Sequence, residues 1–579
     1  MYDKHPYVPV SSNETDCQVG WNAIRESLRK LARGERRIVC VECYPGVSVQ
    51  EIKQELQTAF DPQVVIDTES LLLPSKEIND RVSALLTDDP VFGVFNSLEV
   101  RDFFDSAKVS EAQQKLESLS GGTALVIGTG AIEVADGSDL LVYADLTRWE
   151  IQKRQRTGEI GNLGADNLDG SPAQKYKRAY FLDWRAADRI KQKLLSRIDL
   201  LLDTNDPATP KMITGDQLRA GLDQVARQPF RVVPFFDPGP WGGHWMERQF
   251  DLPKDVPNYA WCFDCVPEEN SLLLGFGTVR VEIPAINVVF AHPTELLGSH
   301  IFGKFGAEFP IRFDFLDTIE GGNLSLQVHP LDEYVQKHFG LAYTQDESYY
   351  MLDAEPNATV YLGLREDIDP PAMLKDLEAA QEGGPDFDAD RYVNKWPARK
   401  HDHFLIPAGT VHCSGAGSMV LEISATPYIF TLKLWDWGRL GLDGQPRPIN
   451  IARGEENIQW NRKTTWVKEN LVNRVEAVSQ GDGWREERTG LHELEFIETR
   501  RHWFTGVVPH DTNGTVNVLN LVEGAEAIVE SPVGSFAPFV VHYAETFIVP
   551  ASVGGYQIRP HGPSAGKQCA TLKAYVRPE

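Results

Sequence analysis

The chain is 579 residues long, which exceeds what one hydrophobic core supports, so about three or four domains are expected. Its formal net charge of −26 argues against a nucleic-acid backbone or an anionic membrane as a partner, although a local cationic pocket could still hold a phosphorylated small molecule. The N-terminal residues lack the basic and apolar regions of a signal peptide, and no apolar run approaches the ~20 residues that span a bilayer. We therefore expect a soluble, cytoplasmic protein.

The cysteines do not form the pattern of a disulfide framework. There are seven, an odd number in a long chain. Two Cys-x-x-Cys pairs, Cys40/Cys43 and Cys262/Cys265, could be zinc or redox motifs, but both lie in strand-like segments. Because positions i and i+3 of a strand face opposite sides, the two sulfurs of each pair would diverge. We expect buried structural thiols.

Residues 1–215 have the pattern of an α/β domain. Residues 36–46 resemble a strand entering a turn, and residues 49–60 have helical spacing. Three further strands are predicted at 64–67, 123–128 and 140–145. A helix rich in Lys and Arg is predicted to follow from Trp149. Strands that alternate with helices favour a parallel sheet.

The strand-turn-helix at 38–60 lies where a P-loop kinase would hold phosphates. Its turn, Tyr44–Gln50, lacks the Gly-Lys-Ser/Thr that supplies the phosphate-binding lysine and the Mg²⁺ ligand. Together with Asp145–Arg148 and with Arg154 and Arg156, the layout weakly resembles a nucleoside-kinase-like domain that has lost its nucleotide chemistry. A generic α/β domain used for packing or dimerisation is the alternative, and the sequence favours it.

After Met212 the sequence changes to short strands with frequent Gly, Pro and aromatic residues, which is typical of a β-sandwich or barrel. One helical insertion is predicted near 370–400. A Gly-rich break near 479–483 divides this region. Three domains are therefore predicted, at 1–215, 216–480 and 481–579.

The most informative residues lie in the middle domain. Gln327 and His329 stand at i and i+2 of a predicted strand and so share one face. His412 follows a second strand and a Pro-Ala-Gly turn, and Glu347 lies between the two segments. Two imidazoles, an amide oxygen and a carboxylate predict a mononuclear metal site inside a β-barrel. The last segment repeats the strand-Pro-Ala pattern without a following His, so a second barrel without a metal is expected.

Several motifs in the same order resemble those of type I mannose-6-phosphate isomerases, which are cupins. The resemblance covers roughly residues 230–579 and rests on Trp241–Gly243, Phe309–Ile311, Gly322–Tyr334, Glu347–Tyr350, Pro407–His412, Val420–Ile423 and Thr431–Arg439. It implies an α/β N-terminal domain followed by all-β cupin (jelly-roll) barrels, in a chain that is multidomain α+β overall.

The resemblance also implies that Zn²⁺ is held by Gln327, His329, Glu347 and His412. Neutral imidazoles and a carboxylate suit zinc, and a catalytic zinc keeps one position open. The amide oxygen is an unusual zinc ligand, so another divalent ion (nickel, iron or manganese) remains open. A metal-free cupin with a polar core patch is the other alternative.

Interconversion of an aldose and a ketose moves a proton between carbons and stabilises an enediolate. Glu422 is the candidate base, and a buried carboxylate paired to an arginine is its alternative. Arg439 is the candidate to stabilise the enediolate oxygens, and a surface salt bridge is its alternative. If 431–439 is one unbroken strand, Lys433, Trp435, Trp437 and Arg439 share a face that suits a sugar carrying an anion, although an ordinary core strand would look the same.

Two departures from the family pattern concern phosphate recognition. Asp314 stands where the family has a lysine, and Thr344–Asp346 replaces a Gly-Lys. Arg312 faces the same side as Asp314 and is the candidate to compensate. Metal chemistry is therefore expected to persist, whereas binding of a phosphate is an open question.

The favoured hypothesis is a metal-dependent aldose–ketose isomerase acting on mannose 6-phosphate and fructose 6-phosphate or a close relative. Its expected partners are a sugar or sugar phosphate and, in a possible homodimer, a second copy, with no nucleic acid and no membrane. The alternative is a catalytically inactive sugar-binding or regulatory cupin. A cupin oxygenase that uses Fe²⁺ is a third hypothesis.

Overall fold

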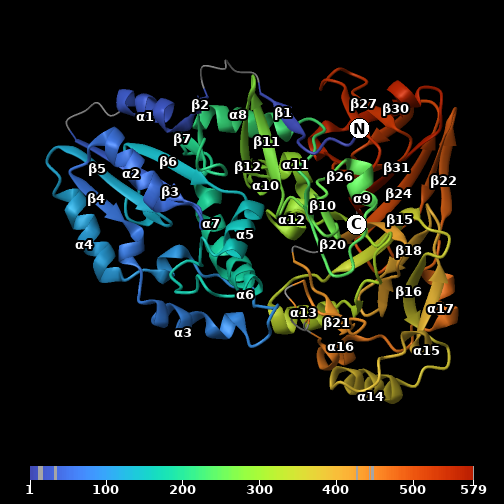
Figure 1. Ribbon diagram of the computed structural model, residues 1–579. Helices are drawn as coiled ribbons and strands as arrows, with labels where there is room; N and C mark the ends of the chain where they lie inside the picture. Colours follow the sequence, from blue (N-terminus) through green and yellow to red (C-terminus); the bar gives the residue numbers. More distant parts are fainter. Residues whose placement is uncertain are drawn as a thin grey trace. The chain divides into compact units, whose positions relative to one another are not determined.

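The computed structural model describes residues 1–10, 17–31, 36–425, 428–442, 444, 447 and 449–577 (Figure 1). The chain divides into two compact units. We call Tyr7–Val225 with Ser271–His292 the N-terminal unit, and Met1–Pro6, Ala226–Asn270 and Pro293–Glu579 the double-barrel unit. Among the described residues, none of the helices combines the length and the apolar character that crossing a lipid bilayer requires.

The N-terminal unit is built on a seven-stranded sheet of order β2-β8-β7-β6-β3-β5-β4. The strands are β2 (Gln18–Val19), β3 (Arg36–Cys43), β4 (Val64–Asp67), β5 (Gly122–Gly128), β6 (Leu140–Asp145), β7 (Leu200–Asp203) and β8 (Lys211–Thr214). Strands β4, β5, β3, β6 and β7 are parallel, whereas β8 runs antiparallel to both of its neighbours, β7 and β2. The predicted parallel sheet is confirmed, and its central strands are continuous apolar runs because both of their faces are buried.

Helices connect these strands. They are α1 (Gly20–Leu31), α2 (Val49–Phe60), α3 (Ser75–Leu86), α4 (Ser106–Glu117), α5 (Arg148–Thr157), α6 (Pro172–Arg178), α7 (Trp184–Leu194) and α8 (Gly215–Val225). Helix α2 has the predicted bounds and buries Ile52, Leu56 and Phe60, which recur every four residues on one face. The basic helix predicted from Trp149 begins one residue earlier.

The sequence suggested that the N-terminal domain ends at residue 215, but the N-terminal unit extends beyond this residue. It continues to Val225 and includes a later segment with β11 (Ser271–Phe276), β12 (Val279–Pro284) and α10 (Ile286–Ala291). Strand β1 (Tyr7–Pro9) pairs in parallel with β11, so Tyr7 lies opposite Leu273. A pairing between residues so far apart in the sequence leaves no local signal, which is why the predicted boundary missed it.

Buried ion pairs occupy the edge of the N-terminal sheet where the strands end. The Lys191 ammonium lies 2.8 Å from an Asp145 carboxylate oxygen, and both side chains are at most 1% exposed. Tyr44, in the turn after β3, donates its hydroxyl to Asp188 at 2.9 Å, and Asp188 also binds Arg148 at 2.5 Å. The first residue of the turn after β3, Tyr44, is thus tied to a buried ion pair.

The first barrel of the double-barrel unit consists of two antiparallel sheets. One has the order β18-β15-β20-β13-β10-β9 and the other β17-β16-β19-β14-β21. Their strands are β9 (Phe235–Asp237), β10 (Trp261–Cys265), β13 (Arg312–Asp317), β14 (Leu326–Val328), β15 (Asp346–Ala354), β16 (Thr359–Leu364), β17 (Val393–Pro397), β18 (His403–Ile406), β19 (His412–Ser414), β20 (Ser418–Ala425) and β21 (Leu432–Trp435). The predicted change to short strands is confirmed for this unit, but the prediction of an all-β region directly after Met212 is wrong, because residues 215–225 form helix α8 and further helices lie between the strands.

Short helices lie between these strands. They are α9 (Trp245–Phe250), α11 (Pro293–Leu297), α12 (Ser299–Phe305), α13 (Asp332–Phe339), α14 (Pro370–Gln381), α15 (Ala389–Tyr392), α16 (Ile451–Asn457) and α17 (Thr464–Asn470). Helices α14 and α15 form the insertion predicted near 370–400. Helix α14 starts there because Asp369 accepts a backbone hydrogen bond from Ala372 and Pro370 occupies the first turn.

The second barrel also has two antiparallel sheets, of order β22-β23-β24-β31-β26-β29 and β25-β30-β27-β28. The strands are β22 (Glu476–Gly481), β23 (Trp484–Arg488), β24 (Ile497–Phe504), β25 (Val508–Asp511), β26 (Asn517–Glu523), β27 (Glu526–Glu530), β28 (Phe539–His542), β29 (Thr546–Val549), β30 (Gly555–Pro560) and β31 (Cys569–Val576). The Gly-rich break predicted near 479–483 is the turn of the β22–β23 hairpin, in which Gly483 has φ +72°.

All seven cysteines are buried free thiols, which confirms the prediction made for the two Cys-x-x-Cys pairs. Burial raises the pKa of Cys40, Cys43, Cys262 and Cys265 well above the ordinary value. These thiols are therefore protonated and act as small apolar side chains.

Candidate metal centre

Four polar side chains converge inside the first barrel from both of its sheets. Gln327 lies in β14 and His329 directly follows it, whereas His412 begins β19 and Glu347 lies in β15. Gln327 and His412 are direct cross-strand neighbours, which brings their side chains together. His329, Glu347 and His412 are completely buried, and Gln327 is 7% exposed.

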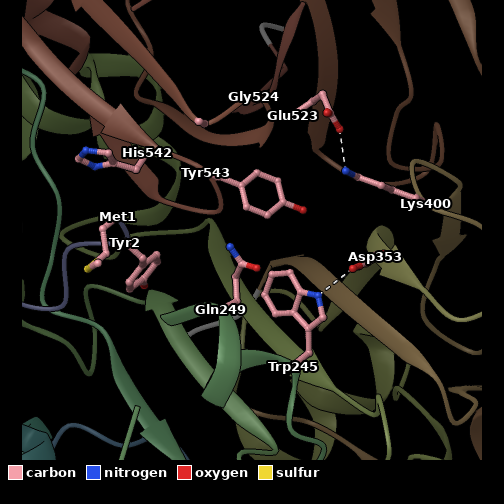
Figure 2. A pocket seen from close by; sticks show the side chains of 11 residues that line it. Met1, Tyr2, Trp245, Gln249, Asp353, Lys400, Glu523, Gly524, His542 and Tyr543 are labelled. Atoms are coloured by element: carbon pink, nitrogen blue, oxygen red, sulfur yellow. Dashed lines mark hydrogen bonds and ion pairs between the residues drawn. The ribbon is translucent and has the colours of Figure 1, made fainter. Parts of the chain in front are cut away.

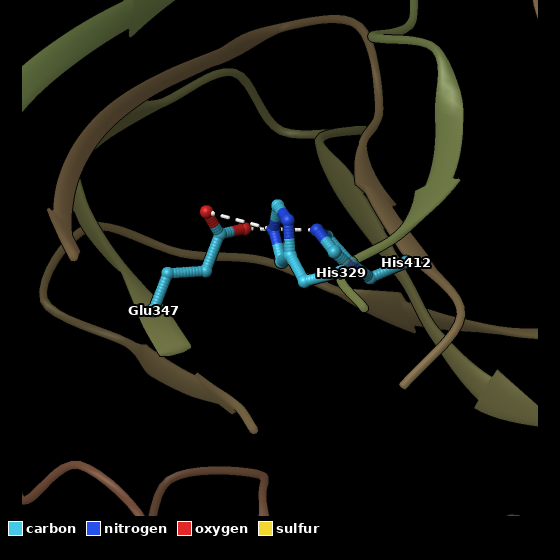
Figure 3. A group of neighbouring side chains, drawn as sticks. All are labelled: His329, Glu347 and His412. Atoms are coloured by element: carbon cyan, nitrogen blue, oxygen red, sulfur yellow. Dashed lines mark ion pairs between the residues drawn. The ribbon is translucent and has the colours of Figure 1, made fainter. Parts of the chain in front are cut away.

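The ligand atoms of His329, Glu347 and His412 all lie within 4.8 Å of one another (Figure 3). The two carboxylate oxygens of Glu347 are 3.1 Å from His329 Nε2 and 2.8 Å from His412 Nε2. The amide nitrogen of Gln327 is 3.3 Å from His412 Nε2, so a half-turn of that amide would place its oxygen at the same point. The structure thus brings together all four residues that the sequence suggested.

The second nitrogen of each imidazole is held by the backbone. His329 Nδ1 lies 2.9 Å from the carbonyl oxygen of Phe430, and His412 Nδ1 lies 2.8 Å from that of Thr410. A carbonyl only accepts hydrogen bonds, so both Nδ1 atoms carry the proton and both Nε2 lone pairs face the centre. This arrangement orients histidine for binding a metal ion.

The charges of the centre are strongly coupled. Burial alone would raise the pKa of Glu347, but the neighbouring imidazoles His329 and His412 hold it well below its usual range. Burial would lower the pKa of His329, yet the Glu347 carboxylate raises it, whereas burial lowers the pKa of His412. The Glu347 side chain is therefore a carboxylate anion, and it faces the Nε2 atoms of two imidazoles.

This donor set fits a divalent metal ion. It combines two imidazoles oriented by the backbone, one carboxylate and one amide, which leaves room in the coordination sphere for water or substrate. Within the described residues, it contains the only group of three or more His, Cys, Asp or Glu side chains with this proximity.

Gln345 is a supporting residue that the motif comparison missed. Its amide nitrogen donates to Glu347 at 3.1 Å, and its oxygen accepts the backbone N–H of Phe430 at 2.9 Å. It thereby connects the carboxylate to the segment whose carbonyl holds His329. The only signal in the sequence was its spacing, two residues before Glu347 and hence on the same side of an extended segment.

Glu422 lies beside the centre on β20, between β13 and β15. Its direct cross-strand neighbours are Asp314 and Tyr349. Burial, together with the nearby carboxylates Glu347 and Asp314, raises the pKa of Glu422 well above its ordinary value. The side chain predicted as a base therefore lies among other carboxylates, and this environment favours its protonated form.

Arg312 and Asp314 face the same side of β13, as the alternation predicted, and form a buried ion pair of 3.5 Å. Burial raises the pKa of Asp314 to about 7, while Arg312 opposes that shift. Arg312 is therefore paired with Asp314, which reduces the positive charge that Arg312 can offer a ligand.

Lys433 is a positively charged residue that lies directly opposite one of the four candidate ligands. It is the direct neighbour of Gln327 across the β14–β21 pair, on the other side from His412. Within the described part of the chain, its ammonium has no hydrogen bond or ion pair. Burial lowers the pKa of Lys433 to about 8, so the side chain still carries its charge at neutral pH.

The condition of one unbroken strand over 431–439, on which the shared face depended, is not met. Strand β21 ends at Trp435, because Trp437 and Gly438 both adopt positive φ angles (+57° and +66°) and Arg439 donates its backbone N–H to Asp436. Lys433 and Trp435 remain in the strand, whereas Trp437 and Arg439 lie beyond the turn. The shared face of aromatic and cationic side chains therefore does not extend to these two residues.

The side chains beyond the turn make local contacts. Arg439 binds Asp436 at 2.6 Å, and the Trp437 indole donates to the carbonyl of Leu324 at 2.7 Å. Arg447, which the sequence comparison did not single out, binds the other oxygen of Asp436 at 2.5 Å. Asp436 thus binds two arginines through its two oxygens, and the ion pair of Arg439 is largely buried rather than the surface salt bridge of the alternative interpretation.

A separate pocket of about 520 Å³ lies elsewhere in the double-barrel unit (Figure 2). Its wall includes Trp245, whose indole donates to Asp353 at 2.8 Å, and Lys400, which binds Glu523 at 2.6 Å. None of the four candidate metal ligands lines it. These polar side chains already use their hydrogen-bonding groups and charges on one another. The pocket is therefore a weaker candidate site than the candidate metal centre.

Comparison with known proteins gives different results for different parts of the chain. Residues 20–227 match a family described as a domain of unknown function (DUF8485). Mannose-6-phosphate isomerases from Streptococcus mutans and Bacillus subtilis are 27% identical over 215 residues and 25% identical over 242 residues. These alignments cover 37% and 41% of this chain, and 62% and 69% of the relatives. The chain therefore spans less than two thirds of the Streptococcus mutans protein.

Solved structures with a similar arrangement include the mannose 6-phosphate isomerase of Bacillus subtilis, with a TM-score of 0.48 and 17% identity. That match covers 60% of this chain and 100% of the other. A putative mannosephosphate isomerase from Archaeoglobus fulgidus has a TM-score of 0.45 at 17% identity, over 61% of this chain and 98% of the other.

Proposed function

We propose that the protein is a metal-dependent aldose–ketose isomerase that interconverts mannose 6-phosphate and fructose 6-phosphate or a closely related sugar pair. The observation that carries this proposal is the buried convergence of Gln327, His329, Glu347 and His412, with both Nε2 atoms directed inward. The similarity to mannose-6-phosphate isomerases supports the choice of reaction.

These four side chains would hold the metal ion, with Zn²⁺ as the first candidate. When bound, such an ion polarises the substrate's oxygen atoms and stabilises negative charge on them. Lys433, beside Gln327, would add a cation that attracts the developing enediolate or the phosphate group. Glu422 would donate or accept the proton that moves between the two carbons, with its high pKa favouring the protonated state at the start.

The test is a coupled assay of mannose 6-phosphate isomerisation, run in parallel with free mannose. Turnover of the phosphorylated sugar that is lost after chelation and restored by Zn²⁺ would support the proposal. Turnover of free mannose alone would indicate that Asp314 marks a changed substrate. The absence of turnover with either sugar, while metal remains bound, would refute the proposed activity.

Replacing Lys433 with methionine is expected to lower kcat/KM for mannose 6-phosphate by about a hundredfold, because a cation near developing negative charge is lost. The metal content should not change, since Lys433 is not a ligand. Lys468→Met is the matched control, because Lys468 is exposed and should leave the activity unchanged. Equal kinetics for the two variants would exclude Lys433 from substrate binding.

The second candidate function is that of a sugar-binding or regulatory cupin without turnover. It is favoured by one observation: the carboxylates of Asp314, Glu347 and Glu422 gather at the centre, and Arg312 is paired with Asp314. In that case, sugar would raise the melting temperature of the metal-loaded protein, but the coupled assay would detect no product.

A further inference from the structure

The interior of the second barrel changes from apolar to polar along its strands. Phe504, Val508, Cys569 and Ile558 belong to its apolar core. Because side chains alternate along a strand, the residues two positions away from these point to the same interior. They are His502 on β24, His510 on β25, Thr571 on β31 and Tyr556 on β30. Polar groups thus continue the interior face beyond the apolar core.

These side chains form one compact cluster. His502 is the direct cross-strand neighbour of Thr571, and Arg500 is that of Lys573, which lies on the same face of β31. The imidazoles of His502 and His510 are 4.4 Å apart between ring centroids, and His510 stacks on Tyr556 at 4.9 Å. His502, His510, Thr571 and Lys573 are all at least nine-tenths buried.

Within the described part of the chain, much of the hydrogen-bonding capacity of this cluster is unused. Both ring nitrogens of His510, His502 Nδ1 and the Thr571 hydroxyl have no hydrogen-bond partner. The Lys573 ammonium likewise has no hydrogen bond or ion pair there, although the side chain is only 7% exposed. Buried polar groups normally have partners, and a buried charge without one is costly.

The neighbouring acids are already committed to other cations. Arg500 binds Glu498 and lies 3.7 Å from Glu486, and His502 Nε2 lies 3.5 Å from Glu486. The Tyr575 hydroxyl also donates to Glu498. Among these acids, Glu486 raises the pKa of Lys573 most, and Asp511, which is exposed on the outer side of β25, raises it further. Burial lowers the pKa of Lys573 only to about 8, so its charge persists at neutral pH.

We propose that this polar end of the second barrel binds a small oxyanion, a phosphate or a carboxylate, with Lys573 as its charge partner. The Lys573 ammonium, the Thr571 hydroxyl and the N–H group of His510 offer donors that an acceptor-rich anion would satisfy. A water molecule could use some of these donors but would not neutralise the charge. A metal ion does not fit, since a lysine ammonium repels it. The site is independent of the proposed isomerase activity.

The experiment is calorimetric titration of the full chain with inorganic phosphate and, separately, with acetate. We expect the wild-type chain to bind at least one of the two, and Lys573→Met to weaken that binding by at least about tenfold. Binding of phosphate alone, of acetate alone or of both would identify which oxyanion the site accepts. Lys567→Met is the matched control, because Lys567 is exposed on the same barrel and should leave the affinity unchanged.

Thermal melting of the same variants distinguishes a ligand site from a structural lysine. In buffer without either anion, Lys573→Met should melt above the wild type, because it removes a buried charge that lacks a partner. If that variant does not fold, His510→Phe, which keeps the stack on Tyr556, should still weaken binding. The proposal is overturned if neither anion binds more tightly than about 1 mM, or if both variants bind as the wild type does.

Discussion

Replacing His412 with alanine is expected to release the metal ion and to lower kcat/KM for the isomerisation by at least about a thousandfold, the upper end of what a single electrostatic stabiliser contributes. His412 supplies one of the two imidazoles, and its Nε2 lies 2.8 Å from Glu347. Without it, the Gln327 amide loses the imidazole 3.3 Å away, and of the two imidazoles Glu347 retains His329. The remaining set is too weak to retain a metal ion through purification.

Metal content per chain, measured by elemental analysis before and after dialysis, checks this expectation together with the coupled assay. His300→Ala is the matched control, because His300 is exposed on α12 and should leave both quantities unchanged. Full metal occupancy in His412→Ala would remove this residue from the ligand set. Full activity without metal would contradict the proposed chemistry itself.

The metal centre could be predicted because its signals are local. Gln327 and His329 share a face through strand alternation alone, and the Pro-Ala-Gly turn places His412 at the start of a strand. The placement of Arg312 and Asp314 on one face followed from the same rule, whereas their ion pair was not predicted. The resemblance to a known family added the order of the motifs, which alternation could not provide.

The end of β21 could not be predicted in this way. A tryptophan at position 437 gives no warning of a positive φ angle, since left-handed backbone is rare for bulky residues. The turn is stabilised by contacts that are not readable from the sequence, such as Asp436 with Arg447 and the Trp437 indole with Leu324. Tertiary contacts therefore determined that Lys433 and Trp435 remain in strand β21, whereas Trp437 and Arg439 lie beyond its end.

The division of the chain was predicted only in part, for a similar reason. The alternation of strands and helices locates the sheet of the N-terminal unit. The return of residues 271–292 to that unit depends on the pairing of β1 with β11, which is non-local. Likewise, the buried charges of this unit stand in ordinary helix and strand sequence, and only the fold reveals their partners.

Replacing Lys191 with methionine is expected to destabilise the N-terminal unit by ~3–5 kcal/mol, the usual cost of removing one partner of a buried ion pair. The Asp145 carboxylate would remain buried and would keep, among the described residues, the Asn287 amide at 2.9 Å and the backbone N–H of Leu146 at 3.0 Å. The Lys191 ammonium also lies 4.1 Å from the centre of the Tyr44 ring, and this contact would be lost as well.

Hydrogen exchange of the β3 and β6 backbone measures the stability of this unit within the full chain. Lys193→Met, two residues away on α7, is the matched control: Lys193 is 63% exposed and lies 3.6 Å from Glu99, so its loss should cost ~1 kcal/mol or less. Adding Asp145→Asn to Lys191→Met should recover part of the stability, because it removes the uncompensated charge. Equal protection in the Lys191 and Lys193 variants would mean that the ion pair does not hold this edge of the sheet together.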